Sequence, residues 1–293
     1  MTTSPTPTSP PTTYGVRLRA AMDEHGPFCP GIDPHAALLA QWGLPDTVAG
    51  LERFAMTCVE AFGGVVAAAK PQSAFFERFG SAGVAVLERT LAGLRHAGTL
   101  SLLDVKRGDI GTTMAGYAQA YLSDGSPLRA DAVTLSPYLG YESLRPALDL
   151  AAETGRGVFV LTLTSNPEGR SVQHALLDGS TVAAAVVAGV AADNAAASAA
   201  GRLGSVGMVV GATVGSAVTE LGLDLAGAGG PLLAPGLGAQ GGTPAALRET
   251  FGPALGQVLG TSSREVLEAG PDAGALRDAA RRAADELTAA LAH

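Results

Sequence analysis

The sequence predicts a single (β/α)8 barrel that follows a short N-terminal tail. Short apolar or β-branched runs alternate with longer Ala- and Leu-rich stretches, and eight such units follow one another. Alternating strands and helices form parallel sheets with helical crossovers, and 293 residues suit a barrel of roughly 250 residues. An open doubly wound sheet shares this alternation, but no Gly-x-Gly-x-x-Gly fingerprint or P-loop opens an expected helix.

The expected strands are short runs of apolar and β-branched residues. Residues 1–13 precede them as a Thr/Ser/Pro tail whose four prolines favour a disordered, extended chain, and residues 14–293 form the barrel domain. In chain order, the expected strands are Phe28–Asp33, Val65–Lys70, Leu100–Lys106, Ala132–Ser136, Gly157–Thr164, Gly207–Ala212, Leu232–Gly236 and Ala254–Leu259.

The expected helices are amphipathic or Ala-rich segments between these strands. Long loops after the fifth strand (165–179) and after the seventh (237–243) fall where barrel enzymes build their active sites. In chain order, the expected helices are Thr47–Ala61, Ala82–Ala97, Thr112–Leu122, Glu142–Thr154, Thr181–Ala200, Ser216–Ala226, Pro244–Thr250 and Pro271–Leu291.

Composition excludes several classes of protein. A net charge of −8 disfavours general binding to nucleic acids or anionic membranes, and a hydrophobic fraction of 47% excludes disorder throughout. The N-terminus lacks the pattern of a signal peptide, and the uncharged run 180–192 is too short to span a bilayer. Cys29 and Cys58 lie in apolar segments and are expected to be buried, reduced thiols of a cytoplasmic protein.

Charged residues gather at the ends of the first three expected strands. Asp33 and Lys70 end the first two, while Asp104 and Lys106 belong to the third and Asp109 follows it. Because side chains alternate along a strand, Asp104 and Lys106 are expected to point to the same side. Charges are costly in a partly desolvated barrel mouth unless they are paired, so this alternating array indicates a functional site.

A glycine-rich loop after the seventh strand suits an anion. The run 236–242 is followed by Thr243-Pro244, which is typical of a helix start, and Arg264 follows the next strand. Barrels often bind phosphate after strands seven and eight. The sequence therefore predicts a phosphate site in this loop.

The stretch Asp104-Val105-Lys106-Arg107-Gly108-Asp109 resembles the Asp-x-Lys-x-x-Asp signature of the orotidine 5′-monophosphate decarboxylases. Further segments match that family in order, especially its longer bacterial branch, and the matches extend from about residue 27 to residue 264. They are Gly31-Ile32-Asp33-Pro34, Ala69-Lys70-Pro71-Gln72, Thr164-Ser165-Asn166-Pro167, Val210-Gly211-Ala212-Thr213, Pro235-Gly236-Leu237-Gly238-Ala239-Gln240-Gly241-Gly242 and Gly260-Thr261-Ser262-Ser263-Arg264.

The resemblance implies roles for the charged array and a cofactor-free reaction. Lys106 would protonate the carbanion left by loss of carbon dioxide. Asp104 and Asp109 would lie beside the scissile carboxylate. Lys70 and Asp33 would hold the ribose hydroxyls and order the array.

The resemblance also implies a substrate site shared by the two subunits of a homodimer. Ser165 would contact the pyrimidine, with Thr164 as the alternative, and Gln240 and Arg264 would bind the 5′-phosphate. Gly236 and Gly241 would also belong to that site. Ile110 and Thr113 would join Asp109 in completing it from the partner subunit.

Two other functions remain open at this point. One is a related magnesium-dependent 3-keto-L-gulonate 6-phosphate decarboxylase, and the other is a non-catalytic barrel that binds a phosphate ligand. The Lys-Pro-Gln and Thr-Ser-Asn-Pro segments and Gln240 favour the nucleotide enzyme, and the five scattered histidines show no metal-ligand spacing. No metal site is therefore expected.

Overall fold

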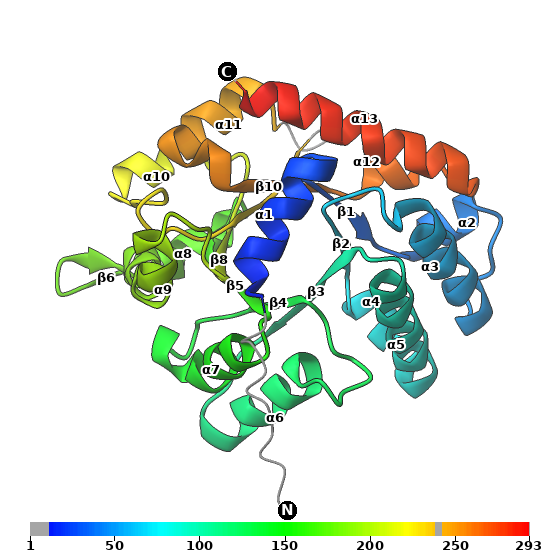
Figure 1. Ribbon diagram of the computed structural model, residues 1–293, viewed down its shortest axis with the longest axis horizontal. Coiled ribbons are helices and arrows are strands. Elements are labelled where there is room, and N and C mark those ends of the chain that lie inside the picture. The colour runs from blue at the N-terminus through cyan, green and yellow to red at the C-terminus, as the bar shows by residue number, and fades with distance from the viewer. Residues whose placement is uncertain (1–11, 238–241, 293) are drawn as a thin grey trace, which may run out of the picture.

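The strands pair into a closed parallel barrel in the computed structural model, which describes residues 12–237 and 242–292 (Figure 1). β1 pairs with both β2 and β10, so the sheet has no free edge. The predicted barrel is confirmed and the open doubly wound sheet is wrong. Around the barrel, the strands in chain order are β1 (Phe28–Ile32), β2 (Ala68–Pro71), β3 (Leu100–Arg107), β4 (Ala132–Leu135), β5 (Gly157–Leu163), β8 (Val206–Val210), β9 (Leu232–Pro235) and β10 (Val258–Ser262).

Helices surround the barrel and fill the connections between its strands (Figure 1). A small antiparallel hairpin, β6 (Leu176–Leu177) and β7 (Ser180–Thr181), projects from the connection after β5. The helices are α1 (Tyr14–His25), α2 (Ala36–Gln41), α3 (Val48–Phe62), α4 (Ala74–Glu77), α5 (Gly80–His96), α6 (Gly111–Leu122), α7 (Arg145–Glu153), α8 (Arg170–Gln173), α9 (Val182–Ala199), α10 (Ala217–Glu220), α11 (Pro244–Phe251), α12 (Arg264–Leu267) and α13 (Ala273–Leu291), with 3-10 turns η1 (Tyr141–Leu144), η2 (Pro167–Gly169) and η4 (Gly252–Gln257).

The second strand begins at Ala68 rather than Val65, and two further expected elements differ more from those observed. The last strand begins at Val258 rather than Ala254, because residues 252–257 form the 3-10 turn η4, in which Ala254 is buried without being a strand residue. The helix expected over residues 216–226 is only the short α10. Gly222, with a φ of 64°, terminates it, and the apolar residues that follow are buried in irregular structure.

Helix α1, which the sequence analysis did not predict, lies across one end of the barrel (Figure 1). Its buried face contributes Tyr14, Leu18 and Met22 to the inner core of the barrel. The Tyr14 ring meets Phe159 edge-on at a centroid distance of 6.0 Å. A Cβ at Gly157 would lie 2.3 Å from the Tyr14 ring, so only glycine fits the start of β5 beneath this helix.

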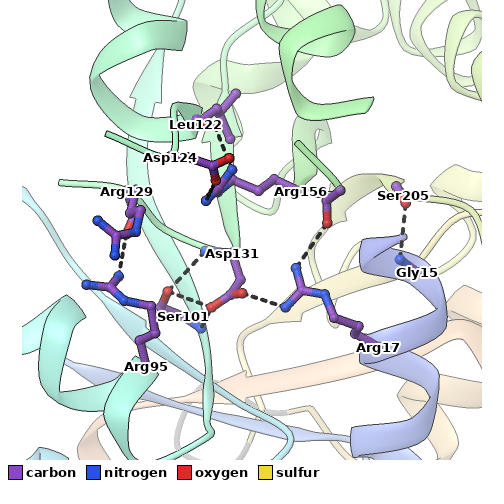
Figure 2. A network of polar contacts seen from close by, with 11 residues as sticks. Gly15, Arg17, Arg95, Ser101, Leu122, Asp124, Arg129, Asp131, Arg156 and Ser205 are labelled. Atoms are coloured by element: carbon purple, nitrogen blue, oxygen red, sulfur yellow. Dashed lines mark hydrogen bonds and ion pairs between the residues drawn. The ribbon is translucent and has the colours of Figure 1, made fainter. Parts of the chain in front are cut away.

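A polar network fastens α1 to the strands that it covers (Figure 2). The Asp131 carboxylate, just before β4, accepts hydrogen bonds from Arg17 Nη1 at 2.6 Å and from the backbone N–H of Ser101 at 3.0 Å. Arg17 also donates to the carbonyl of Gly155 at 3.0 Å. Helix α1 is therefore held over the amino-terminal end of the barrel by hydrogen bonds as well as by its apolar face.

Helix α9 is the one helix among the described residues that is long and apolar enough to cross a membrane, with a mean hydropathy of 1.5. Its contacts identify it as a barrel helix, because one face packs on β5 and β8 through Val186 and Val190. Asn194 on that face is 1% exposed and donates to the carbonyls of Val206 and Ala228. The expected packed helix is confirmed.

Both cysteines are buried and free, as expected. Burial raises the pKa of the Cys29 thiol to about 12, so this cysteine stays protonated at neutral pH.

Candidate active site

Three charged side chains meet at the carboxyl ends of β2 and β3. Asp104 Oδ1 lies 2.6 Å from Lys106 Nζ, and Asp104 Oδ2 lies 3.6 Å from Lys70 Nζ. Lys70 and Asp104 are 7% and 8% exposed, whereas Lys106 is exposed at the mouth of the barrel. The carboxylate thus holds one buried and one accessible ammonium, and the accessible ammonium is free to meet a ligand.

The pKa values of the buried pair keep both groups charged. Burial alone would lower the pKa of Lys70, but the carboxylates of Asp33 and Asp104 outweigh burial and raise that pKa above its ordinary value. Burial alone would raise the pKa of Asp104, but Lys70, Lys106 and a hydrogen bond from Thr134 outweigh burial and lower that pKa. The site therefore has fixed charges at neutral pH.

The backbone at Lys106 departs from the regular strand that the sequence analysis assumed. Lys106 has a φ of 44°, in the left-handed region, and the pairing of β3 with β4 shifts register between Leu103 and Arg107. The contact at 2.6 Å agrees with the prediction that Asp104 and Lys106 point to the same side, although the backbone at Lys106 is not that of a regular strand. The two side chains still meet, because the irregular backbone directs the lysine back to the carboxylate.

A cavity of about 380 Å³ opens beside this charged group, lined by the ends of β1, β2, β9 and β10. Three polar atoms on its wall are buried without a hydrogen-bond partner in the described part of the chain: Asp33 Oδ1, Gln72 Oε1 and Thr261 Oγ1. Buried polar atoms are normally paired, so these three are candidates to contact a polar ligand. The sequence analysis predicted Asp33 as a site residue, whereas it named Gln72 and Thr261 only within segments that match the family.

Two residues of the predicted phosphate site line the same cavity. They are Arg264 and Gly236. Gly236 has a φ of 99° and its carbonyl accepts a hydrogen bond from Gly242, so the loop needs glycine at its start. Helix α11 begins directly after this loop, with Thr243 as its N-cap. Two predicted contacts, Gln240 and Gly241, lie outside the described residues.

The loop after β5 distinguishes Thr164 from Ser165. The Thr164 hydroxyl donates to Asn166 at 2.7 Å and accepts from Gln173 at 2.7 Å, so its single proton is already engaged. Ser165 is exposed, and its hydroxyl makes no hydrogen bond with the described residues. It lines a second cavity, of about 350 Å³, between the ends of β5 and β8.

Asp109, Ile110 and Thr113 are not brought into contact with the charged group of their own chain. Asp109 Oδ1 instead accepts a hydrogen bond from the backbone N–H of Ile110 at 2.8 Å, just before α6. Ile110 is 61% exposed, and the nearby β4–α7 connection exposes Tyr138 at 76% and Leu139 at 52%. This end of the barrel therefore exposes apolar side chains, of which Ile110 directly follows the aspartate in the chain.

The sequence profile of the Orotidine 5′-phosphate decarboxylase / HUMPS family matches residues 26–279. The chain belongs to this family.

Relatives within the family share most of its length. The orotidine 5′-phosphate decarboxylases of Salinispora arenicola and Streptomyces coelicolor are 61% and 60% identical over 278 and 280 residues, covering 95% of this chain and 98% of each relative. A Streptomyces avermitilis protein described as an orotidine 5′-phosphate decarboxylase has a crystal structure with a TM-score of 0.92, at 59% identity over 97% of this chain and 98% of that one.

Members of this family with different chemistry would need different ligands at the site. Within residues 12–237 and 242–292, no three His, Cys, Asp or Glu side chains are grouped so as to hold a metal ion. The two carboxylates on the cavity side of β1 and β3, Asp33 and Asp104, both face the Lys70 ammonium instead. The arrangement thus pairs these carboxylates with lysine ammonium groups.

Proposed function

We propose that this protein is an orotidine 5′-phosphate decarboxylase, which converts orotidine 5′-monophosphate into uridine 5′-monophosphate and carbon dioxide. The observation that carries this proposal is the Lys106 ammonium, held 2.6 Å from Asp104, which lines a cavity together with Arg264. Relatives that are 54–61% identical bear the same name along nearly the whole chain.

The chemistry follows from the charges. When the bond between C6 and the carboxylate carbon breaks, carbon dioxide leaves and the electron pair stays on C6. Lys106 stabilises this carbanion and then donates its proton to C6; water restores the ammonium. A pair of unit charges at ~4 Å and an effective dielectric of ~20 interacts by about 4 kcal/mol. Asp104 beside the substrate carboxylate adds a repulsion that ends when carbon dioxide departs.

The remaining residues bind the substrate. Lys70 and Asp33, whose buried Oδ1 has no hydrogen-bond partner among the described residues, contact the ribose hydroxyls. Ser165, whose hydroxyl is available, contacts the pyrimidine. Arg264 binds the 5′-phosphate together with the loop residues Gly236, Gln240 and Gly241. Binding energy from the phosphate, remote from C6, helps to desolvate and orient the reacting part.

The active unit is a cytoplasmic homodimer in which Asp109, Ile110 and Thr113 complete the partner's site. The support is local: Asp109 does not contact Lys106 of its own chain, and the apolar side chains of Ile110, Tyr138 and Leu139 are exposed beside it. An apolar surface of this kind is typical of a subunit interface.

The test is a direct assay. Purified protein is mixed with orotidine 5′-monophosphate, and the loss of substrate absorbance is followed with and without EDTA. We expect turnover that EDTA leaves unchanged, because Lys106 supplies the charge that a metal would otherwise provide. Activity that EDTA abolishes and magnesium restores would favour a sugar-phosphate decarboxylase instead, and binding without turnover would favour a phosphate-binding barrel.

A further inference from the structure

Thr134, on β4, lies at the centre of the hydrogen bonds that shape the end of β3. Its side chain is 1% exposed. The Thr134 hydroxyl accepts hydrogen bonds from two successive backbone N–H groups, those of Val105 and Lys106, each at 3.0 Å. It donates its own proton to Asp104 Oδ1 at 2.7 Å. One hydroxyl has one donor and two acceptor sites, so these three bonds use all of them.

We propose that Thr134 is a positioning residue that holds the Lys106 ammonium and the Asp104 carboxylate in their working geometry. The proposal rests on the function proposed above and extends it to a residue that does not touch the substrate. The two accepted bonds stabilise the irregular backbone that gives Lys106 its φ of 44°, and the donated bond fixes the oxygen that Lys106 Nζ meets at 2.6 Å.

Direct contact alone does not determine where Lys106 lies. The Lys106 side chain is 45% exposed, so packing alone does not hold it in place. If the Asp104 carboxylate were free to rotate, the ammonium could turn toward solvent with it. Lys70, on the neighbouring strand β2, contacts the other oxygen of Asp104 at 3.6 Å, which leaves Oδ1 to Thr134 and Lys106. Thr134 therefore acts through Asp104 as well as through the backbone.

The chain offers matched variants for a test. Thr134→Val keeps the shape of the side chain and removes all three bonds, whereas Thr134→Ser keeps the hydroxyl. Thr162→Val is the control, because Thr162 is also 1% exposed on a barrel strand but donates only to Val160 of its own strand. Thr134→Cys, with a weakly bonding thiol, serves as an intermediate variant if the valine variant does not fold.

In the assay with orotidine 5′-monophosphate, we expect Thr134→Val to lower kcat about 100-fold while KM changes by no more than about threefold. Thr134→Ser and Thr162→Val should keep kcat near that of the parent. In the parent, the hydrogen bond from Thr134 lowers the pKa of Asp104. Thr134→Val removes this bond, so it should raise that pKa and move the acidic limb of the kcat profile to higher pH. Lys70, Lys106 and Asp33 still face this carboxylate in the variant.

A crystal structure of Thr134→Val gives a readout that does not depend on activity. We expect the contact between Lys106 and Asp104 to be lost or the φ of Lys106 to leave the left-handed region. Unchanged geometry, or equal losses of kcat in Thr134→Val and Thr162→Val, would overturn the positioning role. If the parent protein does not turn over the nucleotide, the proposed function fails, while the crystallographic comparison still decides the role of Thr134.

Discussion

At the scale of single residues, the site depends on a strained lysine. A non-glycine residue in the left-handed region costs on the order of 1–3 kcal/mol, and the surrounding structure must hold it there. Two observed contacts do so: the backbone N–H of Lys106 donates to Thr134, and the carbonyl of the next residue, Arg107, accepts from Ser136 at 2.7 Å. Such strain at the residue proposed as the proton donor is consistent with a geometry kept for function.

Removing this lysine should separate chemistry from binding. We expect Lys106→Ala to lower kcat severely while the Kd for uridine 5′-monophosphate stays near that of the parent, because the strongest interaction of the ammonium is with the carbanion. Turnover and calorimetric titration measure the two quantities. Arg202→Ala, which removes an exposed cation far along the chain, is the control. A loss of affinity that matches the loss of turnover would contradict this role.

Arg264 should show the opposite behaviour. We expect Arg264→Ala to weaken binding of uridine 5′-monophosphate by about 1.5–3 kcal/mol, the range for a hydrogen bond to a charged group. Uridine, which lacks the phosphate, should bind the variant and the parent equally well. If the variant binds uridine 5′-monophosphate as tightly as the parent, Arg264 is not the phosphate ligand.

The charge on Asp104 should make stability depend on pH. Its pKa is lowered in the folded protein, so its contribution is complete above the unfolded value of about 3.9 and is lost as pH falls through the folded value. We expect urea unfolding to show a smaller fall in stability below about pH 4 for Asp104→Asn than for the parent. Asp285→Asn, which changes an exposed carboxylate on α13, should keep the parent's slope. Equal slopes in all three proteins would show that Asp104 makes no such contribution.

The sequence predicted the charged part of the site but not its supports. Lys70, Asp104 and Lys106 were predicted to meet because charges at the ends of apolar strands are unusual. Thr134 was not predicted, since a threonine in a strand is common and its partners depend on the register between β3 and β4. The predicted role of Asp109 requires a second copy of the chain, because its expected partner is the Lys106 of that copy.

At the scale of elements, strands were predicted better than the segments that close the barrel. The apolar runs indicate all eight strands but place the last one four residues too early. Each strand has this signal because it must be buried on both faces. Helix α1 gave no comparable signal. Its sequence is polar apart from one narrow apolar face. That face covers the inner core at the end of the barrel, a role that depends on the closed fold and not on the local sequence. The last strand was displaced because Ala254 and Leu255 are apolar but belong to a turn.

The network beneath α1 should contribute measurably to folding. Asp131→Ala leaves Arg17 and the backbone N–H of Ser101 without their acceptor (Figure 2). We expect the free energy of unfolding to fall by about 1–3 kcal/mol, the cost of partly buried groups left unpaired. Kinetic constants should stay unchanged, because this network lies at the barrel end opposite the site. Asp285→Ala is the surface control, and a loss of stability equal to that of the control would show that the network adds nothing.

At the scale of the whole molecule, the two ends of the barrel serve different purposes. The amino-terminal end is closed by α1 and its hydrogen bonds, while the carboxyl-terminal end carries the lysines, Arg264 and the exposed apolar surface around Ile110. A protein with a net charge of −8 repels an anionic nucleotide at long range. The cations at this one end must therefore attract and orient the substrate locally, and a partner subunit that covers the same end would exclude water from the site.

A shared site can be tested by mixing two inactive variants. If each site combines Lys106 of one chain with the partner's Asp109, a mixed dimer of Lys106→Ala and Asp109→Ala chains has one site with both lesions and one site with neither. Random pairing makes half of the dimers mixed, and one of the two sites in each is intact. We therefore expect co-refolded chains to recover about a quarter of the parent's activity.

The mixing experiment requires proof that chains exchange between dimers. Chains that carry different tags provide this proof, because a mixed dimer co-purifies with either tag. Lys106→Ala chains refolded with differently tagged Lys106→Ala chains must remain inactive, because no pairing of these chains restores the lysine. If chains exchange but the mixture of the two variants stays inactive, each site is confined to one chain. Asp109 would then have to reach Lys106 by a rearrangement of the loop before α6, and the exposed Ile110, Tyr138 and Leu139 would need another explanation.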